Sequence, residues 1–229
     1  LRFLQQRPDA RSRKLADFLA HARDLHELAS LQRRVLPEPT RLSLLAPDAR
    51  AQAERLGPFH PMLDDFVGDL TGASPFQIIS AWEMRTYMTD VLLRDSDVFS
   101  LAHSLELRVP FIDLPLLSWL WPQPTRFKYQ DHRTKRALAD AVSDLVPAAI
   151  RHRRKQGFTF PLSHWMRREL RPFLEATFAP DSLAACPWLD SPAVARLWDD
   201  FKNHHEDRAW SRVWSLAVLV SFANRRPSP

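Results

Sequence analysis

The chain has 229 residues, of which 45% are hydrophobic and 26% are charged, so it can bury a core and is not of the disordered class. Its net charge of +5 permits a nucleic-acid partner and suits a phosphate-handling enzyme equally well. No run approaches the roughly 20 apolar residues that cross a bilayer, and the first residues are too charged for a signal peptide. The single cysteine, Cys186, excludes an internal disulfide, so we expect a cytoplasmic protein with Cys186 as a small core residue.

Helical periodicity dominates the N-terminal part of the chain. Apolar residues recur close to every 3.6 positions from about Ser12 to Val35, which predicts one amphipathic helix that ends before Pro37. Four prolines interrupt residues 40–75, which predicts short helices joined by loops. The chain does not start with methionine, and we expect that it begins within a longer protein.

The rest of the chain also has the spacing of helices, with no alternating strand of useful length and no internal repeat. The predicted helices have the approximate bounds 76–93, 98–105, 114–120, 133–145, 147–151, 162–174, 192–203 and 209–224. The last of them is apolar nearly all round, so we expect it to be buried. The tail 226–229 is expected to be disordered. The predicted fold class is therefore mainly α.

One short segment between helices, residues 103–113, carries charges on an otherwise apolar stretch. Glu106, Arg108 and Asp113 lie within eight residues, and charged side chains are seldom fully buried unless they are paired. Pro110 interrupts a helix and favours an extended conformation in the residue before it. We expect a helix that ends near residue 105 and a rigid turn that holds Glu106 and Arg108 at the rim of a pocket. A structural ion pair at a helix end is the alternative.

A second segment is strongly basic. Residues 151–155 place five basic or potentially basic side chains in a row, and a solvated loop is one interpretation of them. The other is an anchored loop, in which Gly157 allows positive φ or close backbone approach and Lys155 meets a phosphate as a point charge. Lys128 and Lys135 add charge near the start of a helix, where anions bind well, although ordinary surface lysines would give the same pattern.

Acidic and histidine residues do not predict a metal site. Asp95, Asp97 and Asp113 offer the oxygens that Mg²⁺ prefers, but we predict that they cap helices instead. The nine histidines lack metal-ligand spacing with cysteine or glutamate. The four glycines form no glycine-rich loop, so the usual nucleotide cradle is not part of this chain. We therefore predict no metal ligand here.

Three blocks, taken in order, resemble the C-terminal synthetase domain of the glutamine-dependent asparagine synthetases. They are LLRDSDVFSLAHSLELRVPFID at 92–113, TKRALADAVSDLVPAAIRHRRKQGFTFPLSHW at 134–165 and WSRVWSLAVLVSF at 210–222. Their order and separations make the resemblance specific over residues 76–225. Residues 1–75 resemble only loosely the variable helical region that follows the family's nucleotide-binding core.

The resemblance implies the helical C-terminal part of an adenine-nucleotide α-hydrolase-like (PP-loop) synthetase domain. The family's PP-loop, its acidic metal-binding loop and the glutaminase cysteine have no counterpart in the sequence, so the ATP-binding α/β sheet is missing from this chain. ATP and Mg²⁺ are therefore expected to be bound largely by residues outside it. We expect the chain to be inactive as an isolated piece, whether it is a fragment or one subunit of a split enzyme.

The implied activity is that of an ATP-dependent carbon–nitrogen ligase. ATP activates a carboxylate, aspartate in the prototype, as an acyl-adenylate, and ammonia from glutamine attacks the acyl carbon. Glu106 matches the family's glutamate that accepts a proton from the attacking amine. Lys155 matches the lysine that stabilises charge on the phosphates.

Lesser roles follow from the same resemblance. Arg108 and Asp113 match positions that support the turn of Glu106. Arg108, Lys135 and Gly157 are candidates for contact with substrate or phosphate. The implied partners are a small-molecule carboxylate acceptor, ammonia, and the missing glutaminase and PP-loop parts, and a homodimer is compatible with the family.

Two other functions stay open. The chain could be a non-catalytic helical module that binds a partner protein, including the ATP-binding subunit of a split synthetase. The basic run 151–155 motivates a nucleic-acid binder, but no helix shows the basic stripe with interleaved aromatic residues that such binders use. We therefore predict neither nucleic acid nor membrane as a partner, and the sequence does not name the acceptor.

Overall fold

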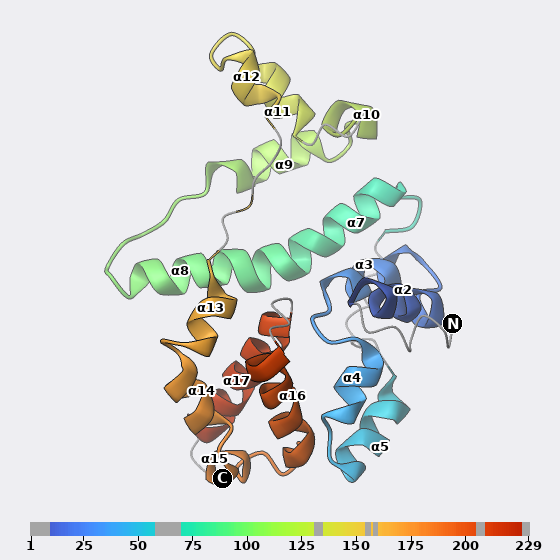
Figure 1. Ribbon diagram of the computed structural model, residues 1–229. Helices are drawn as coiled ribbons and strands as arrows, with labels where there is room; N and C mark the ends of the chain where they lie inside the picture. The colour runs from blue at the N-terminus through green and yellow to red at the C-terminus, as the bar shows by residue number, and fades with distance from the viewer. Residues whose placement is uncertain are drawn as a thin grey trace. The chain divides into compact units, whose positions relative to one another are not determined.

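The computed structural model describes residues 10–57, 70–130, 135–153, 157, 160–204 and 209–225 (Figure 1). Within these residues every regular element is a helix, and Leu45 and Leu189 form an isolated antiparallel bridge. The predicted mainly α class is confirmed for this part of the chain. Packing divides the protein into a first unit, residues 1–69 with 160–229, and a second unit, residues 70–159. The division into blocks at residue 75 stays a prediction.

Two helices replace the single long helix predicted at the N-terminal end. Helix α2 spans Ala10–His21 and helix α3 spans Leu25–Arg33. The second helix starts at Asp24, whose side chain accepts hydrogen bonds from the backbone N–H groups of His26 and Glu27. This cap satisfies donors that would otherwise lack partners at the helix start. The prediction was wrong here because the apolar spacing continues across the break.

Short helices follow, as the prolines predicted. Helix α4 covers Glu38–Ser43 and helix α5 covers Pro47–Leu56. Each carries a proline at its first or second position. Backbone N–H groups in the first turn of a helix have no intrahelical acceptor, so proline, which lacks this group, costs no hydrogen bond there. Gly57 ends α5 with φ of 77°, a left-handed conformation that glycine adopts without strain.

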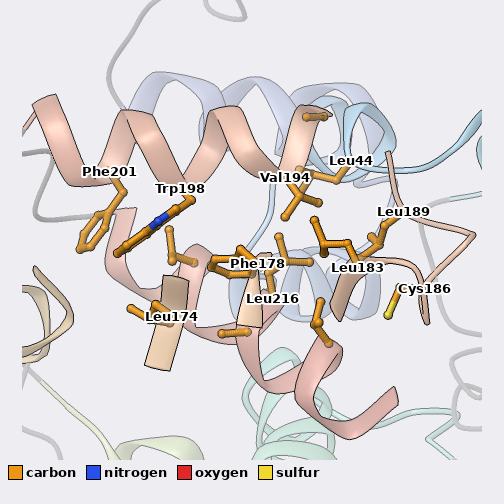
Figure 2. Packing of buried hydrophobic residues seen from close by; sticks show 14 of the residues in the cluster. Leu44, Leu174, Phe178, Leu183, Cys186, Leu189, Val194, Trp198, Phe201 and Leu216 are labelled. Atoms are coloured by element: carbon orange, nitrogen blue, oxygen red, sulfur yellow. The ribbon is translucent and has the colours of Figure 1, made fainter. Parts of the chain in front are cut away.

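The core of the first unit forms around the C-terminal helices (Figure 2). These helices are α13 (Leu162–Arg167), α14 (Arg171–Thr177), α15 (Pro180–Leu183), α16 (Ser191–His204) and α17 (Trp210–Arg225). Helix α17 contacts the other four and buries Val213, Ala217 and Val220 completely. The expected burial of this helix is therefore confirmed on one face. It is wrong on the other face, where Phe222 and Val218 are about half exposed.

Aromatic packing closes this core at one end. The Trp198 ring lies 6.0 Å from the Phe201 ring and 6.1 Å from the Phe178 ring, measured between centroids (Figure 2). The Arg167 guanidinium lies 4.3 Å from the centre of the Phe201 ring, and its Nε donates to the Phe201 carbonyl at 3.1 Å. Cys186 is fully buried, and burial raises the pKa of its thiol. Its predicted place as a small core residue is confirmed.

Buried charges join α2 to the start of α4. The Glu38 carboxylate pairs with Arg34 Nη1 at 2.9 Å and with Arg41 Nη2 at 2.6 Å. The Asp17 Oδ1 atom accepts the Glu38 backbone N–H at 3.1 Å. Burial by itself raises the pKa of Glu38, but the hydrogen bond from Arg41 and the charges of Arg41, Arg34 and His21 outweigh it. The pKa of Glu38 therefore lies below its ordinary value.

The second unit begins with three helical segments that follow one another without a break. They are α7 (Pro75–Glu83), the π-helix η1 (Met84–Leu93) and α8 (Arg94–Leu101). Ser74 and Gln77 form a capping box that starts α7, and Thr89 Oγ1 donates to the Met84 carbonyl five residues earlier. Asp95 and Asp97 lie within the first turn of α8, which continues from η1, so their predicted role as caps is wrong.

Short helices complete the second unit. They are the 3₁₀ turn η2 (Pro110–Ile112), α9 (Leu114–Leu120), α10 (Thr125–Lys128), α11 (Arg136–Ala141) and α12 (Ala148–Arg151). Large apolar side chains remain exposed on this unit, among them Phe99, Phe111 and Leu114. An exposed apolar surface of this extent is typical of an interaction face. No helix of the described residues is both long and apolar enough to cross a membrane.

Two valines of α17 provide a matched test of the core. Val213 is fully buried and Val218 is 52% exposed. We expect Val213→Ala to lower the free energy of unfolding by about 2 kcal/mol, because it removes buried methyl groups and leaves a cavity. Val218→Ala should change it by less than about 0.5 kcal/mol. Chemical denaturation measures both, and equal effects would contradict the assigned core.

The buried charge cluster predicts a loss of stability in acid. Because the folded pKa of Glu38 is depressed, its pairing stabilises the protein above the unfolded pKa of about 4.3 and is lost as the pH falls through the folded value. We expect the free energy of unfolding of Glu38→Gln to lie below the wild-type value near neutral pH and to approach it in acid. Glu54→Gln, on exposed α5, is the control. A difference between Glu38→Gln and wild type that does not change with pH contradicts this assignment.

Candidate functional site

Helix α8 ends in a left-handed turn. Ser104 has φ of 57°, its N–H donates to the Leu101 carbonyl at 2.9 Å, and the Leu105 N–H donates to the Ser100 carbonyl at 3.0 Å. These two bonds form the Schellman arrangement, in which glycine usually occupies the left-handed position. The helix therefore ends earlier than the predicted residue 105, and the chain leaves it in a defined direction.

From Leu105 to Val109 the chain has no regular secondary structure and is exposed. Val109 has φ of −119° and ψ of 85°, outside the helical region, as expected for a residue before Pro110. The η2 turn follows, and Asp113 then caps α9 by accepting the Leu116 N–H at 3.4 Å. A turn is therefore present where one was predicted, and Asp113 caps the helix that follows it.

Glu106 and Arg108 form an ion pair on this extended segment. The distance from Arg108 Nη2 to Glu106 Oε1 is 2.7 Å. The Arg108 side chain is 83% exposed and the Glu106 side chain is 68% exposed. Within the described part of the chain, the other carboxylate oxygen of Glu106, Oε2, has no hydrogen-bond or ion-pair partner. A pair this exposed adds little to stability. The predicted pair is present, but fold stability alone gives little reason for it.

An open cavity of about 320 Å³ lies beside the segment. It is lined by Leu93, Arg94, Ser96, Asp97, Leu107 and Val109. Leu107 and Val109 contribute to this lining, whereas Glu106 and Arg108 do not. The expected pocket is therefore present, but the ion pair is not part of its wall.

The basic loop is only partly described. Lys155 lies outside the described residues, so its approach to Glu106 stays a prediction. Gly157 is exposed, its φ is not in the left-handed region, and no atom lies within 4 Å of the place a Cβ would occupy. The structure therefore shows neither the positive φ nor the close packing that would require glycine there. Close approach of a ligand to Gly157 stays a prediction.

The two other lysines differ in their surroundings. Lys135 is exposed and immediately precedes α11, with φ of 58°, so it does lie at a helix start. Lys128 ends α10 instead, and its Nζ donates to the Leu120 and Trp121 carbonyls at 3.3 and 3.1 Å. Burial lowers the pKa of this ammonium group. The prediction that Lys128 adds charge at a helix start is wrong, because it satisfies the carbonyl end of α9.

Acidic residues of the described chain do not gather at the site. No group of three or more histidine, cysteine, aspartate or glutamate side chains among the described residues could hold a metal ion. Asp95 and Asp97 share one helix turn, and Asp113 is engaged as a cap. The described side chains therefore do not by themselves fit a Mg²⁺ ion.

Sequence comparisons decide the family. The asparagine synthase family model matches residues 2–223. The chain belongs to the asparagine synthase family. This confirms the resemblance drawn from the three sequence blocks.

Three bacterial relatives show the extent of the similarity. A provisionally named glutamine-hydrolysing asparagine synthetase of Mycobacterium tuberculosis (strain H37Rv) is 32% identical over 150 residues, 65% of this chain and 22% of the relative. Glutamine-hydrolysing asparagine synthetases 1 and 3 of Bacillus subtilis (strain 168) are 27% identical over 140 residues and 34% identical over 105 residues. These alignments cover 60% and 45% of this chain and 21% and 16% of the relatives. The chain thus spans about a fifth of the length of the first two of these relatives, and no solved structure matches it.

Two site features of this asparagine synthase family member were not found from the sequence. The left-handed position at Ser104 has no glycine or asparagine to mark it. The cavity walls at Arg94 and Leu107 depend on where that turn directs the chain. The only hint of this turn in the sequence is a serine between a helical stretch and Pro110, and this pattern is too common to predict a left-handed residue.

Substitution at Ser104 tests the turn in this family member. We expect Ser104→Val to lower the free energy of unfolding by about 1–2 kcal/mol, because a β-branched residue is strained at positive φ. Ser104→Gly should leave it within about 0.5 kcal/mol or raise it. Ser118→Val on α9, an exposed position with helical backbone, is the control for the same change. Equal losses for Ser104→Val and Ser118→Val would show that Ser104 is not left-handed.

Proposed function

We propose that this chain carries the amide-forming part of an ATP-dependent carbon–nitrogen ligase. The enzyme adenylates a carboxylate, aspartate in the prototype, and joins it to ammonia from glutamine. The observation that carries this proposal is the exposed carboxylate of Glu106, whose Oε2 atom has no hydrogen-bond or ion-pair partner among the described residues. Membership in the asparagine synthase family and the names of the relatives support the same reaction class.

Glu106 acts as the general base in this proposal. Ammonia attacks the acyl carbon of the adenylate, a C–N bond forms, and the bond from that carbon to the AMP oxygen breaks. The nitrogen loses a proton to the Glu106 carboxylate, so the products are the amide, AMP and a protonated glutamate that returns its proton to water. An oxygen without a partner is suited to this transfer, since no existing hydrogen bond must first be broken.

Arg108 positions the base. Its guanidinium holds Oε1 at 2.7 Å and leaves Oε2 for the nucleophile. Because the pair is so exposed, water competes for it until a bound substrate covers the segment. The guanidinium group of Arg108 has further N–H donors, so contact between Arg108 and the substrate is also part of the proposal.

The basic loop meets the negative charge of the phosphates. We assign to Lys155 the stabilisation of charge as the adenylate and pyrophosphate form, with Lys135 and Gly157 as further contacts. ATP is a substrate of this reaction and is bound largely by protein outside this chain. A Mg²⁺ ion bound with it would neutralise phosphate charge, but the described residues do not fit the ion and we derive no step through it.

A second function is favoured by a different observation. The exposed apolar side chains of the second unit, among them Phe99 and Leu114, suit a helical module that is covered by a partner. In that case the chain supplies a docking surface for an ATP-binding subunit and not the base itself. The two functions differ in what substitution of Glu106 does.

Two substitutions in the full-length protein test the catalytic assignment. We expect Glu106→Gln to lower ATP-dependent amide formation by about 10²–10⁴-fold, since the amide cannot accept the proton. Lys155→Ala should lower it as well and should reduce release of pyrophosphate. Glu54→Gln, an exposed glutamate on α5, is the matched control and should keep normal turnover.

The same assay separates the alternatives. Normal turnover of Glu106→Gln would remove it as the base, even where the chain is needed for assembly. Loss of turnover with normal pyrophosphate release places the defect after adenylation, as the general-base role requires.

A further inference from the structure

The cavity beside the segment of Glu106 has a lining of two kinds. Its polar lining comes from the first turn of α8, to which Arg94, Ser96 and Asp97 belong. The rest of the described lining is aliphatic and consists of Leu93, Leu107 and Val109. All of these residues belong to the second unit, so the cavity lies within one packed unit.

The charged side chains of this lining do not pair with each other. Arg94 and Asp97 are three residues apart on α8, so their side chains are neighbours on the helix surface. Other cations and carboxylates with this spacing do pair, namely Arg41 with Glu38 at 2.6 Å and Lys202 with Asp199 at 3.0 Å. Within the described part of the chain, neither Arg94 nor Asp97 has a hydrogen-bond or ion-pair partner for its side chain. The helix therefore offers a neighbouring cation and anion to a ligand.

Water reaches the aliphatic lining as well. Leu107 is 54% exposed and Val109 is 39% exposed. Aliphatic surface in contact with water is unfavourable, and an apolar group placed against it would remove that surface from water. A ligand that complements the whole lining therefore has a negative group, a positive group and an apolar body.

We infer that this cavity binds a free amino acid with an aliphatic side chain. The α-carboxylate of the amino acid pairs with Arg94, whose guanidinium group offers two parallel donors, and the α-ammonium group pairs with Asp97. Both charges of the ligand are attached to one carbon atom, which suits two partners on one helix turn. The aliphatic side chain lies against Leu107 and Val109. The cavity volume of about 320 Å³ is within the range of small-molecule sites.

This ligand differs from the carboxylate acceptor of the proposed function. The acceptor has to come within reach of Glu106, and Glu106 is not part of the described lining. A second carboxylate, as in aspartate, would lie against the aliphatic lining without a donor, which is unfavourable. The inference therefore does not depend on the function proposed for Glu106.

Isothermal titration of the full chain with leucine tests the inference. Leucine should bind saturably, with a dissociation constant of roughly 1 mM or tighter. Leucinamide lacks the carboxylate, and 4-methylpentanoate lacks the ammonium group. We expect both analogues, and aspartate, to bind at least about tenfold more weakly than leucine.

Two variants assign each ligand group to its partner. In Arg94→Gln the preference for leucine over leucinamide should disappear, and in Asp97→Asn the preference for leucine over 4-methylpentanoate should disappear. Arg85→Gln and Asp90→Asn change exposed charges of η1 outside the described lining and should keep both preferences. All four side chains are exposed, so the variants should fold, which circular dichroism checks.

Several outcomes would overturn the inference. They are the absence of saturable leucine binding, tighter binding of aspartate than of leucine, and preferences that survive in Arg94→Gln and Asp97→Asn. Loss of the same preferences in Arg85→Gln and Asp90→Asn would also overturn it, because a general effect of net charge would then explain the binding.

Discussion

The left-handed backbone at Ser104 is the constraint on which the geometry of the candidate site depends. Two hydrogen bonds close α8 around it, and the chain then has only five residues before Pro110 fixes its direction again. Leu107 and Val109 of this segment line the cavity, whereas Glu106 and Arg108 pair with each other outside its lining. A helix that continued past Leu101 would mix these two pairs of side chains.

Two glutamates show how the same side chain is used differently. Glu38 is buried, receives donors from two arginines and has a lowered pKa, so it remains a fixed anion and serves the fold. Glu106 is exposed, has one partner on one oxygen, and lies on a segment without regular structure. A carboxylate fully bound by donors is a poor proton acceptor, whereas one with a free oxygen can take a proton. The contrast supports a structural role for the first and a chemical role for the second.

Much of the helical structure was predictable, and the failures have local causes. Residues 114–120 form α9 as predicted, and α16 and α17 begin and end within a residue of the expected bounds. The break between α13 and α14 was missed, because it contains neither proline nor glycine and is closed by the Leu170 N–H, which donates to the Trp165 carbonyl. Glu106 was conspicuous in the sequence as a charge on an apolar stretch, but its role as a base was assigned only through the family resemblance. The cavity beside its segment depends on the turn at Ser104, which local pattern does not reveal.

Basic residues illustrate the difference between sequence and space most clearly. The run 151–155 is conspicuous in the sequence, yet neighbouring like charges repel and separate in water unless a ligand or core holds them. A cavity of the first unit is lined by cations that are inconspicuous in the sequence, because Lys14 and Arg212 are almost a full chain apart. They converge because α17 buries Val213 and Ala217 in the core, and this burial stabilises the helix that carries Arg212. Apolar packing thus supplies the free energy that brings together charged side chains from distant parts of the sequence.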